Sequence, residues 1–485
     1  MRETSDVGQR TAGRGRQPSA ARAGALALAL ACALGAAGCS KPKPAPPALE
    51  QVLAITHVTV VDIVAGNDVP DQTVVVRGSR IAEAGAAASI PVPARATVVD
   101  GRGKYLIPGL WDMHVHALAD AEVARGFLPA FVAWGVTGVR DMGGKVNVMR
   151  AARFAVQVGT VVGPRIVAAG AILDGPQPVD STVSLAVGTP EQARAAVDSL
   201  AAYGADFIKV YTLLPRPAYF AALREAARLH LPVAGHVPDG VTVREAADSG
   251  QRSIEHLRDE TEPICAAVDA ACDRLLDTLR AHGTWLVPTL VVLRAKAILD
   301  DSSLYADPRV WTVPETVRSA WERIREGKQD RPQAYWREKR ARYRMELALV
   351  GEAAKRGVPV LAGTDAGALY TYPGSSLHDE LAQLVRAGLT PAAALRAATL
   401  GAAEFLGAAD SLGTVARGKA ADLVLLDADP LSAIANTRTV RAVVLRGRLF
   451  AGAALDSLRS AEGESLPALP APAATPDTSK ATHRF

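Results

Sequence analysis

Two histidines separated by one residue, His114 and His116, stand in the run WDMHVH. On a β-strand, residues i and i+2 point to the same side, so both imidazole rings could bind one metal ion. The spacing alone is weak evidence, because a chain with nine histidines in 485 residues can produce it by chance. The evidence becomes stronger with the polar residues that stand at or near the ends of other apolar segments, namely Lys209, His236, His256 and Asp365.

Lys209 occupies the middle of DFIKVY, a segment typical of a buried strand. Burying an ammonium group is costly unless it is paired or chemically altered. If the other residues are shared between two ions, a bridging oxygen ligand is missing, and the Lys209 amine could supply it by taking up CO2 to become a carbamate. The alternative is that Lys209 pairs with an acid in the interior. The first interpretation predicts two groups of ligands, with His114, His116 and Asp365 at one ion and His236 and His256 at the other.

The ligand types limit the choice of metal. Imidazole nitrogens and carboxylate oxygens suit zinc, manganese, cobalt or nickel better than calcium or magnesium. We therefore expect two divalent transition metal ions, with zinc as the leading candidate, together with carbon dioxide bound as the Lys209 carbamate. Two cations would lower the pKa of a shared water molecule to roughly 7, so that it could attack a carbonyl at neutral pH. Asp365 would act as general base and acid, accepting the proton of that water and delivering it to the leaving nitrogen.

Eight short apolar segments must position these residues, and each is typical of a strand. Helix-like stretches separate several of them, and this alternation predicts an α/β fold with a (β/α)8 TIM barrel over residues 106–408. Active sites of such barrels lie at the C-terminal ends of the strands, where all the candidate ligands fall. The eight segments are LWDMHVH, GVTGVRD, RIVAAG, DFIKVY, PVAGH, SIEH, TWLVPTLVV and PVLAGTD.

The two ends of the chain have a different pattern. Runs rich in β-branched residues, such as ITHVTVVDIV and RAVVLRGRLF, are bounded by turn residues, which indicates antiparallel strands. We expect residues 50–105 and 409–455 to form one small β-sandwich domain built from both termini. Residues 456–485 are rich in Ala, Pro, Ser and Thr and are predicted to be disordered.

The N-terminus is typical of an exported protein. Arginines precede the apolar run AGALALALACALGAAGC, which is too short to span a membrane and ends at small residues and Cys39. We predict a lipoprotein signal peptide over residues 1–39 with lipidation at Cys39, followed by a proline-rich linker over residues 40–49. Plain secretion and a retained anchor are the alternatives. The expected location is the periplasmic or cell-surface side of a bacterial membrane, with the lipid anchor as the membrane contact.

The net charge of +4 comes mostly from this leader, which holds five arginines and only two acidic residues. The rest of the chain is close to neutral, so nothing indicates nucleic acid as a partner. A small-molecule substrate is expected, and a homo-oligomer is left open. Cys265 and Cys272 could form a disulfide in an oxidising compartment, but a helix over both would separate them by about 10.5 Å, which is beyond disulfide reach.

The motifs together resemble the amidohydrolase superfamily, in particular its prolidase-like and imidazolonepropionase-like branch. They span about residues 50–455 and comprise GLWDMHVHA, GVTGVRDMGG, DFIKVY, AGHV, SIEH, LAGTDAG and DSLGTVARGKAADLVLLDADP. The resemblance implies an α metal, a β metal and a bridging carboxylated lysine. The ligands that it implies are His114, His116 and Asp365 for the α metal, His236 and His256 for the β metal, and Lys209 for the bridge.

Three further residues are candidates for substrate contact. Arg140, at the end of the second strand, could bind a substrate carboxylate or form a structural pair with Asp141. Tyr211 lies two residues after Lys209 and shares its strand face, so its hydroxyl could donate to the substrate, or it could be a satisfied interior tyrosine. His378 is expected on a helix just past the eighth strand.

These observations predict a binuclear metal-dependent amidohydrolase that cleaves amide C–N bonds of dipeptides or N-acyl amino acids. A second hypothesis is a mononuclear cyclic-amide hydrolase or deaminase similar to imidazolonepropionase. Lys209 distinguishes the two hypotheses, because a single ion would not need a bridging carbamate. A third is a catalytically silent binding lipoprotein. The complete set of candidate ligands argues against the third hypothesis, since buried polar residues without a role are costly to keep.

Overall fold

The structure is a computed structural model that describes residues 51–257, 264–265 and 267–459. The predicted signal peptide with Cys39, the predicted linker and most of the predicted tail lie outside these ranges. None of the helices in the described ranges combines the length and the apolar composition that a transmembrane span requires.

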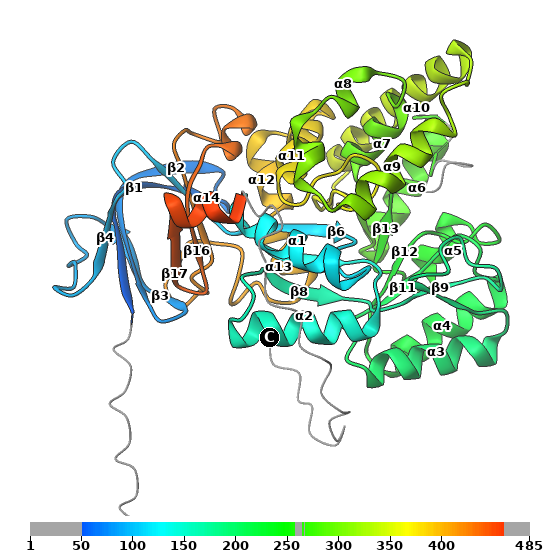
Figure 1. Ribbon diagram of the computed structural model, residues 1–485, viewed down its shortest axis with the longest axis horizontal. Coiled ribbons are helices and arrows are strands. Elements are labelled where there is room, and N and C mark those ends of the chain that lie inside the picture. The colour runs from blue at the N-terminus through cyan, green and yellow to red at the C-terminus, as the bar shows by residue number, and fades with distance from the viewer. Residues whose placement is uncertain (1–50, 258–263, 266, 460–485) are drawn as a thin grey trace, which may run out of the picture. The chain divides into compact units, whose positions relative to one another are not determined.

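Strands from both ends of the chain form one eight-stranded sheet in the order β17-β16-β15-β5-β1-β2-β3, with β4 beside β1. The central strand β5 (Tyr105–Pro108) joins the two halves, because it pairs with β1 (Val52–Asp62) on one side and with β15 (Leu423–Leu426) on the other. Figure 1 shows the blue N-terminal strands beside the orange and red C-terminal strands. The remaining strands are β2 (Asn67–Arg77), β3 (Arg80–Ala86), β4 (Thr97–Asp100), β16 (Val440–Leu445) and β17 (Arg448–Ala451).

The strands of the two termini belong to a single hydrogen-bonded sheet, and alternating apolar residues from both ends of the chain pack in one core. The β3 edge also bonds to the chain just before β15, because the amide of Ile81 donates to the carbonyl of Lys419 at 2.9 Å. The predicted boundary after residue 105 is wrong, since Tyr105 is the first residue of β5. Residues 456–459 are not disordered but belong to α14 (Ala453–Arg459). The core includes Ile55, Val74, Leu106, Leu423 and Val444.

The central region contains two parallel sheets, one of three strands (β6-β7-β8) and one of six (β10-β9-β11-β12-β13-β14). The α/β class is therefore confirmed. β9 (Ile172–Asp174) and β10 (Ser184–Ala186) were not predicted. The predicted segments contain β6 (Leu110–Val115), β7 (Val136–Asp141), β8 (Arg165–Ala168), β11 (Ile208–Val210), β12 (Val233–Gly235), β13 (Ser253–Glu255) and β14 (Trp285–Val287).

The eighth predicted segment, residues 359–365, contains no regular strand. Its backbone nevertheless bonds to β14 on one side and to β6 on the other. The amide of Leu361 donates to the carbonyl of Leu286 at 2.9 Å, and the amide of Asp365 donates to the carbonyl of His114 at 2.7 Å. The segment therefore lies between the two parallel sheets and brings Asp365 beside the end of β6.

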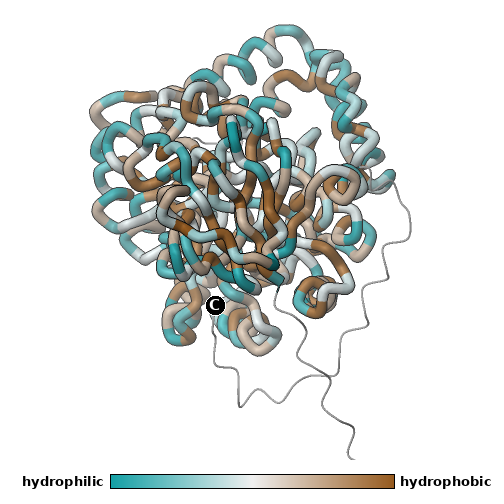
Figure 2. Tube along the Cα trace, turned by 90° about the vertical axis from the view of Figure 1, so that its left-hand side faces the viewer, coloured by the Kyte–Doolittle hydropathy of each residue, from teal (hydrophilic) through white to brown (hydrophobic). Residues whose placement is uncertain are grey.

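Helices surround the parallel strands. In Figure 2 the hydrophobic residues gather on the strands of the interior, while the helices carry a mixture of both kinds. The helices are α1 (Ala121–Ala133), α2 (Val146–Val158), α3 (Pro190–Ala202), α4 (Arg216–Arg228), α5 (Val243–Asp248), α6 (Ala270–His282), α7 (Leu290–Ala297), α8 (Ser302–Tyr305), η1 (Pro308–Thr312), α9 (Glu315–Glu326), α10 (Gln333–Lys355), α11 (Ser375–Arg386), α12 (Pro391–Ala397), α13 (Leu400–Phe405) and η2 (Ile434–Arg438).

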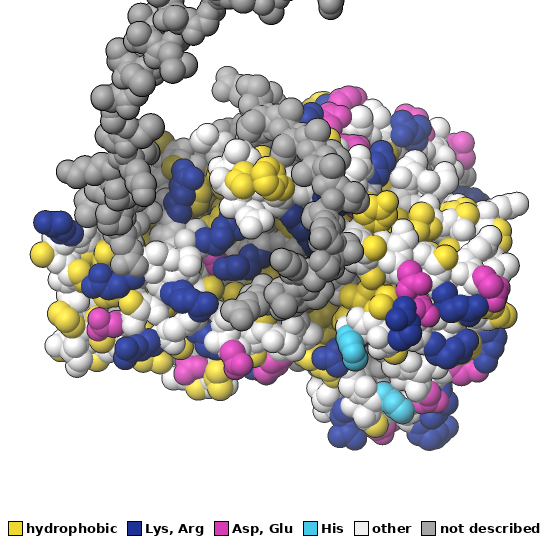
Figure 3. All heavy atoms as spheres, turned by 90° about the horizontal axis from the view of Figure 1, so that it is seen from below, with side chains coloured by type: hydrophobic (Ala, Val, Ile, Leu, Met, Phe, Trp, Pro, Cys, Tyr) yellow, Lys and Arg dark blue, Asp and Glu magenta, His cyan; other side chains and the backbone are white. Residues whose placement is uncertain are grey.

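The face seen from below, along which α2, α3 and α4 run in Figure 1, carries basic and acidic side chains next to each other (Figure 3). Ion pairs account for part of this mixture. Arg228 of α4 lies 2.9 Å from Asp198 of α3, and Arg194 lies 2.8 Å from Glu191. Exposed pairs of this kind contribute little to stability, about 0–1 kcal/mol each.

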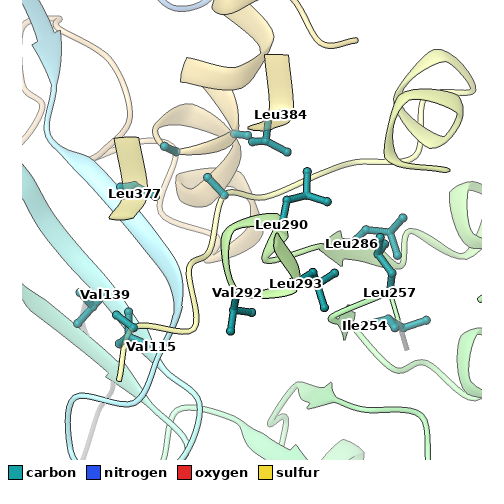
Figure 4. Close-up of a cluster of buried hydrophobic side chains, with 14 of the residues drawn as sticks. Val115, Val139, Ile254, Leu257, Leu286, Leu290, Val292, Leu293, Leu377 and Leu384 are labelled. Atoms are coloured by element: carbon teal, nitrogen blue, oxygen red, sulfur yellow. The ribbon is translucent and has the colours of Figure 1, made fainter. Parts of the chain in front are cut away.

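Helix α7 begins directly after the β14 region and is apolar on nearly all sides, as expected for a helix enclosed by other elements. Leu290, Val292 and Leu293 are buried, and Figure 4 shows them between the strand residues and Leu377 and Leu384 of α11. This packing fixes the N-terminal end of α7, which adjoins the candidate ligands.

Cys265 and Cys272 form a disulfide, with their Cα atoms 5.4 Å apart. The bond is possible because α6 begins only at Ala270, so a single helix does not run through both cysteines. Both residues are buried, and the bridge ties the start of α6 to the chain that follows β13.

Candidate metal centre

The candidate ligands meet at the C-terminal ends of neighbouring strands. One carboxylate oxygen of Asp365 lies 3.4 Å from His114 Nε2 and 3.3 Å from His116 Nε2. The ring centroids of His114 and His256 are 4.5 Å apart, and those of His236 and His256 are 5.0 Å apart. Four histidines from three strand ends therefore face one another around a single carboxylate, although they are far apart in the sequence.

Lys209 lies in the middle of β11 and is fully buried. Within the described part of the chain, its Nζ has no hydrogen-bond partner. Burial lowers the pKa of Lys209 to about 8, although the charges of Glu255 and Asp365 oppose the shift. Gly235 on the adjacent strand leaves room for the Lys209 stem, because a Cβ at Gly235 would lie 3.0 Å from Lys209 Cδ and 2.1 Å from the carbonyl oxygen of Val210.

Each of the four histidines is held from behind through its Nδ1 atom. Such outer contacts orient the ring of a metal ligand and fix its tautomer. The Nε2 atoms of His114 and His236 are buried and have no hydrogen-bond partner among the described residues, which suits the chemistry of metal ligands. The partners of the Nδ1 atoms are Glu255 Oε2 for His114 at 2.8 Å, the Gly143 carbonyl for His116 at 3.0 Å, Thr212 Oγ1 for His236 at 2.8 Å and Thr289 Oγ1 for His256 at 2.7 Å.

Thr289 determines which nitrogen of His256 carries the proton. Its hydroxyl donates to the Pro288 carbonyl at 2.8 Å, so toward His256 Nδ1 the same oxygen can only accept. His256 Nδ1 therefore carries the hydrogen, and Nε2 keeps its lone pair. Thr289 adopts φ 48°, an unusual value for a β-branched residue.

Glu380 caps α7 in place of Thr289, which precedes the helix but makes no cap with its own side chain. The buried carboxylate of Glu380 accepts from the amides of Leu290 at 3.0 Å and Val291 at 2.7 Å. The Thr289 hydroxyl is therefore available to His256, because another side chain satisfies the first amides of the helix.

Residues 105–450 match the family described as "Amidohydrolase family". This match covers well over half of the chain. The chain belongs to the amidohydrolase family. The predicted resemblance is therefore confirmed, and a hydrolase is the class of enzyme that the family and its relatives support.

Several known proteins are similar to this amidohydrolase. Ochratoxinase from Aspergillus niger is 27% identical over 438 residues, which cover 80% of this chain and 84% of that protein. The crystal structure of a putative prolidase from Bifidobacterium longum has a TM-score of 0.67 and 25% identity, covering 84% of this chain and 98% of that chain. A prolidase complexed with N-methylphosphonate-L-proline has a TM-score of 0.65 and 25% identity, with 82% and 99% covered.

Two predicted substrate contacts of the amidohydrolase have other roles in the structure. Arg140 is 1% exposed, and its guanidinium donates to the Met113 carbonyl at 2.6 Å, to Ser253 Oγ at 3.0 Å and to Glu255 at 2.9 Å. Both earlier interpretations of Arg140 are therefore corrected: its donors are taken up inside the protein, and its acidic partner is Glu255 rather than Asp141.

His378 is also occupied by protein partners. It is fully buried in α11, with Nδ1 3.0 Å from Thr437 Oγ1 and Nε2 3.0 Å from the Trp134 carbonyl. Burial lowers the pKa of His378 to about 4. We therefore withdraw it as a substrate contact. Tyr211 stays a candidate, because its partly exposed ring stacks on His236 with 4.1 Å between centroids.

Sequence reasoning missed the residues behind the ligands of the amidohydrolase. Glu255 binds His114 and Arg140 together, and the charge of Arg140 with the His114 hydrogen bond holds the pKa of Glu255 below its usual range despite burial. Asp112 accepts from Thr364 Oγ1 at 2.6 Å and so joins β6 to the segment that carries Asp365. A signal existed, because each acid stands within two residues of a candidate ligand histidine in an apolar strand.

Proposed function

We propose that this amidohydrolase is a binuclear metal-dependent hydrolase that cleaves the C–N bond of dipeptides or N-acyl amino acids. One observation carries the proposal: four imidazoles are fixed through Nδ1 by protein partners and gather near the Asp365 carboxylate, together with the buried Lys209 amine, which has no hydrogen-bond partner among the described residues. A purely structural network would satisfy its buried ring nitrogens with hydrogen bonds.

The donor set fits two transition metal ions. Unpaired imidazole nitrogens and an ionised carboxylate are ligands of zinc and its neighbours. Burial opposes ionisation of Asp365, but the hydrogen bond with His116 and the charges of the histidines hold its pKa well below the usual range. We assign His114, His116 and Asp365 to one ion, and His236 and His256 to the other.

Lys209 would bridge the two ions as a carbamate. The neutral amine attacks CO2, a new N–C bond forms, and one proton is released, which leaves an anion with two oxygens. The lowered pKa of Lys209 supports this step, because the reaction needs the neutral amine. The space above Gly235, which has no Cβ, accommodates the stem of the side chain.

Metal ions at this site would polarise the scissile carbonyl and lower the pKa of a water molecule. Asp365 is placed to accept the proton of that water and to deliver it to the leaving nitrogen, because its carboxylate is ionised and faces both His114 and His116. The carbonyl of Asp365 accepts from Thr371 Oγ1 at 2.7 Å, which holds the residue in its φ 62° conformation. Tyr211, stacked on His236, is the candidate for orienting the substrate.

The relatives support an amide of an amino acid as the substrate class. The prolidase with a bound N-methylphosphonate-L-proline carries a proline analogue, and the structural similarity to it extends over most of both chains. A dipeptide and an N-acyl amino acid share with such a ligand an amino acid with a substituted nitrogen, which bears a carbonyl carbon in the two amides and a phosphonate phosphorus in the analogue.

We also infer that residues 359–366 act as the eighth strand and close the parallel strands into a barrel. Their backbone bonds to β14 and to β6 support this closure, as does the bond from the Asp206 amide to the Ala168 carbonyl at 3.0 Å between β8 and the start of the β11 segment. In a closed barrel, the ends of all eight strands meet around the site.

The proposal is tested by measuring metal content and hydrolysis together. We expect about two ions per chain by elemental analysis after purification with zinc and bicarbonate, and release of free amino acids from a panel of dipeptides and N-acetyl amino acids. Lys209→Ala should lose most of the metal and the activity. Two ions in both proteins would contradict the bridging role of Lys209.

A single-ion enzyme is the second candidate, and one observation favours it. Ligand atoms of His114, His256 and Asp365 all lie within 4.8 Å of one another, which is compact enough for one ion. One ion per chain, unchanged by Lys209→Ala, together with turnover of cyclic amides, would establish this alternative and exclude the binuclear site.

A further inference from the structure

A cavity of about 410 Å³ lies apart from the candidate ligands, none of which lines it. Part of the lining comes from α7, with Val291 and Arg294, and from Ile298 directly after it. The rest comes from α11, from the segment that holds Tyr370 and Tyr372, and from residues around α8. The volume is in the range of sites that bind small organic molecules.

The lining of this cavity has an excess of positive charge. It contains three arginines and two aspartates. Both aspartates are already paired with arginines, because Arg309 lies 2.7 Å from Asp307 and 2.8 Å from Asp379, and Arg438 also pairs with Asp379. In the described part of the chain, Arg294 and Arg386 form no ion pair and no hydrogen bond. The guanidinium groups of Arg294 and Arg386 are thus available to bind an anion.

Most of the uncharged lining is apolar or aromatic, and Ser303 and Gln383 are its polar members. Val291, Ala295, Ile298 and Leu304 supply aliphatic surface, and the ring of Tyr372 lies under the Arg309 guanidinium at 4.6 Å. The Tyr372 hydroxyl is buried and has no hydrogen-bond partner among the described residues. An inorganic anion would leave this surface uncovered, whereas an organic anion with an apolar body would cover it.

We propose that this cavity binds a small organic carboxylate, with the carboxylate on Arg294 and Arg386 and its apolar body against α7 and Tyr372. Guanidinium groups bind carboxylates through paired hydrogen bonds, which gives the site its preference for a planar anion. The carboxylate could belong to the substrate or product of the enzyme, or to a separate ligand. The proposal does not depend on the number of metal ions.

The test is isothermal titration calorimetry of the full zinc-loaded protein with 3-phenylpropionate, which has a carboxylate and an apolar ring but no amide bond. We expect saturable binding, at least about tenfold weaker binding to the Arg294→Gln/Arg386→Gln variant, and similarly weak binding of the neutral 3-phenylpropanamide. Arg337→Gln is the matched control, because Arg337 is an exposed arginine of α10 that does not line the cavity. Arg386→Gln alone covers the case in which the double variant does not fold, since Arg386 is exposed.

Further measurements show whether the probe binds in the cavity and which kind of ligand the cavity takes. Binding retained in Asp365→Asn supports the cavity, whereas loss in that variant places the probe at the metal centre and overturns the proposal. Inorganic phosphate binding as tightly as 3-phenylpropionate would overturn the role of the apolar wall. Competitive inhibition of hydrolysis by the probe identifies a substrate or product carboxylate as the natural occupant, and binding without competition identifies a separate ligand. No saturable binding to the unsubstituted protein would refute the site.

Discussion

The terminal sheet and the candidate metal centre each contain an aspartate in the left-handed conformation beside a histidine. In the sheet, Asp71 has φ 51° and lies 2.7 Å from His57, with side chains that are 67% and 52% exposed. In the centre, Asp365 has φ 62° and lies 3.3 Å from His116, with side chains that are 10% and 24% exposed. The pair in the sheet is hydrated and screened, whereas the pair in the centre must be satisfied by neighbours that tertiary packing supplies.

Positive φ values occur in both regions, but only at the candidate centre do they belong to buried residues with a candidate role. Three residues with positive φ at the candidate centre are buried: His256 and Asp365 are candidate ligands themselves, and Thr289 is hydrogen-bonded to His256. The sheet instead depends on many interchangeable apolar contacts in its core. We therefore expect substitutions in the centre to change function more than stability, and substitutions in the sheet to do the reverse.

The largest effect is expected for Asp365→Asn. Turnover should fall by about 100-fold or more, because asparagine cannot accept and deliver the proton. The melting temperature should change little, since asparagine also tolerates a left-handed conformation. Steady-state kinetics and thermal unfolding of the same preparation check both statements. Full turnover in the variant would remove Asp365 from the mechanism.

Leu106→Ala should have the opposite profile. Leu106 is fully buried in the core of the terminal sheet, so the free energy of unfolding should fall by about 2–5 kcal/mol. Turnover per folded molecule should stay the same. Denaturant titration with kinetics measures the two quantities, and Val98→Ala, at a residue that is 56% exposed, serves as the control. A loss of turnover without a loss of stability would contradict the expectation that the terminal sheet contributes to stability rather than to function.

Thr289→Val should weaken metal binding by about 10–100-fold, because it removes the acceptor that fixes the His256 tautomer while keeping the shape of the side chain. Thr289→Ser keeps the hydroxyl and should restore most of the affinity. Competition with a chelator measures the affinity, and nitrogen NMR of the histidine rings reports the tautomer. Equal affinities of the Val and Ser variants would show that Thr289 acts through packing alone.

The smallest effect is expected for Asp71→Asn, which repeats the chemical change of Asp365→Asn at an exposed site. Loss of the ion pair with His57 should alter the free energy of unfolding by about 0–1 kcal/mol. Metal content and turnover should be unchanged. A loss of activity comparable to that of Asp365→Asn would mean that burial is not what separates the two aspartates.

The sequence predicted seven strands of the central region and the residues at their ends, because alternation, apolar runs and strand length are local properties, but it missed β9 and β10. It predicted neither the single terminal sheet nor the irregular backbone of residues 359–365. The disulfide between Cys265 and Cys272 also stayed open at that level, since it depends on where α6 begins. The predicted leader and lipid anchor lie outside the described residues and stay predictions.

The residue types and the strands that carry them could be identified along the chain, and this was sufficient to predict the group of candidate ligands and the family. The contacts behind the ligands emerged only with the folded arrangement: Glu255 bonds to His114, Thr289 bonds to His256, and Arg140 turns inward to Glu255. Strand formation depends on neighbours along the chain. A buried hydrogen bond between sequence-distant side chains depends on the packing of whole elements, which no local pattern records.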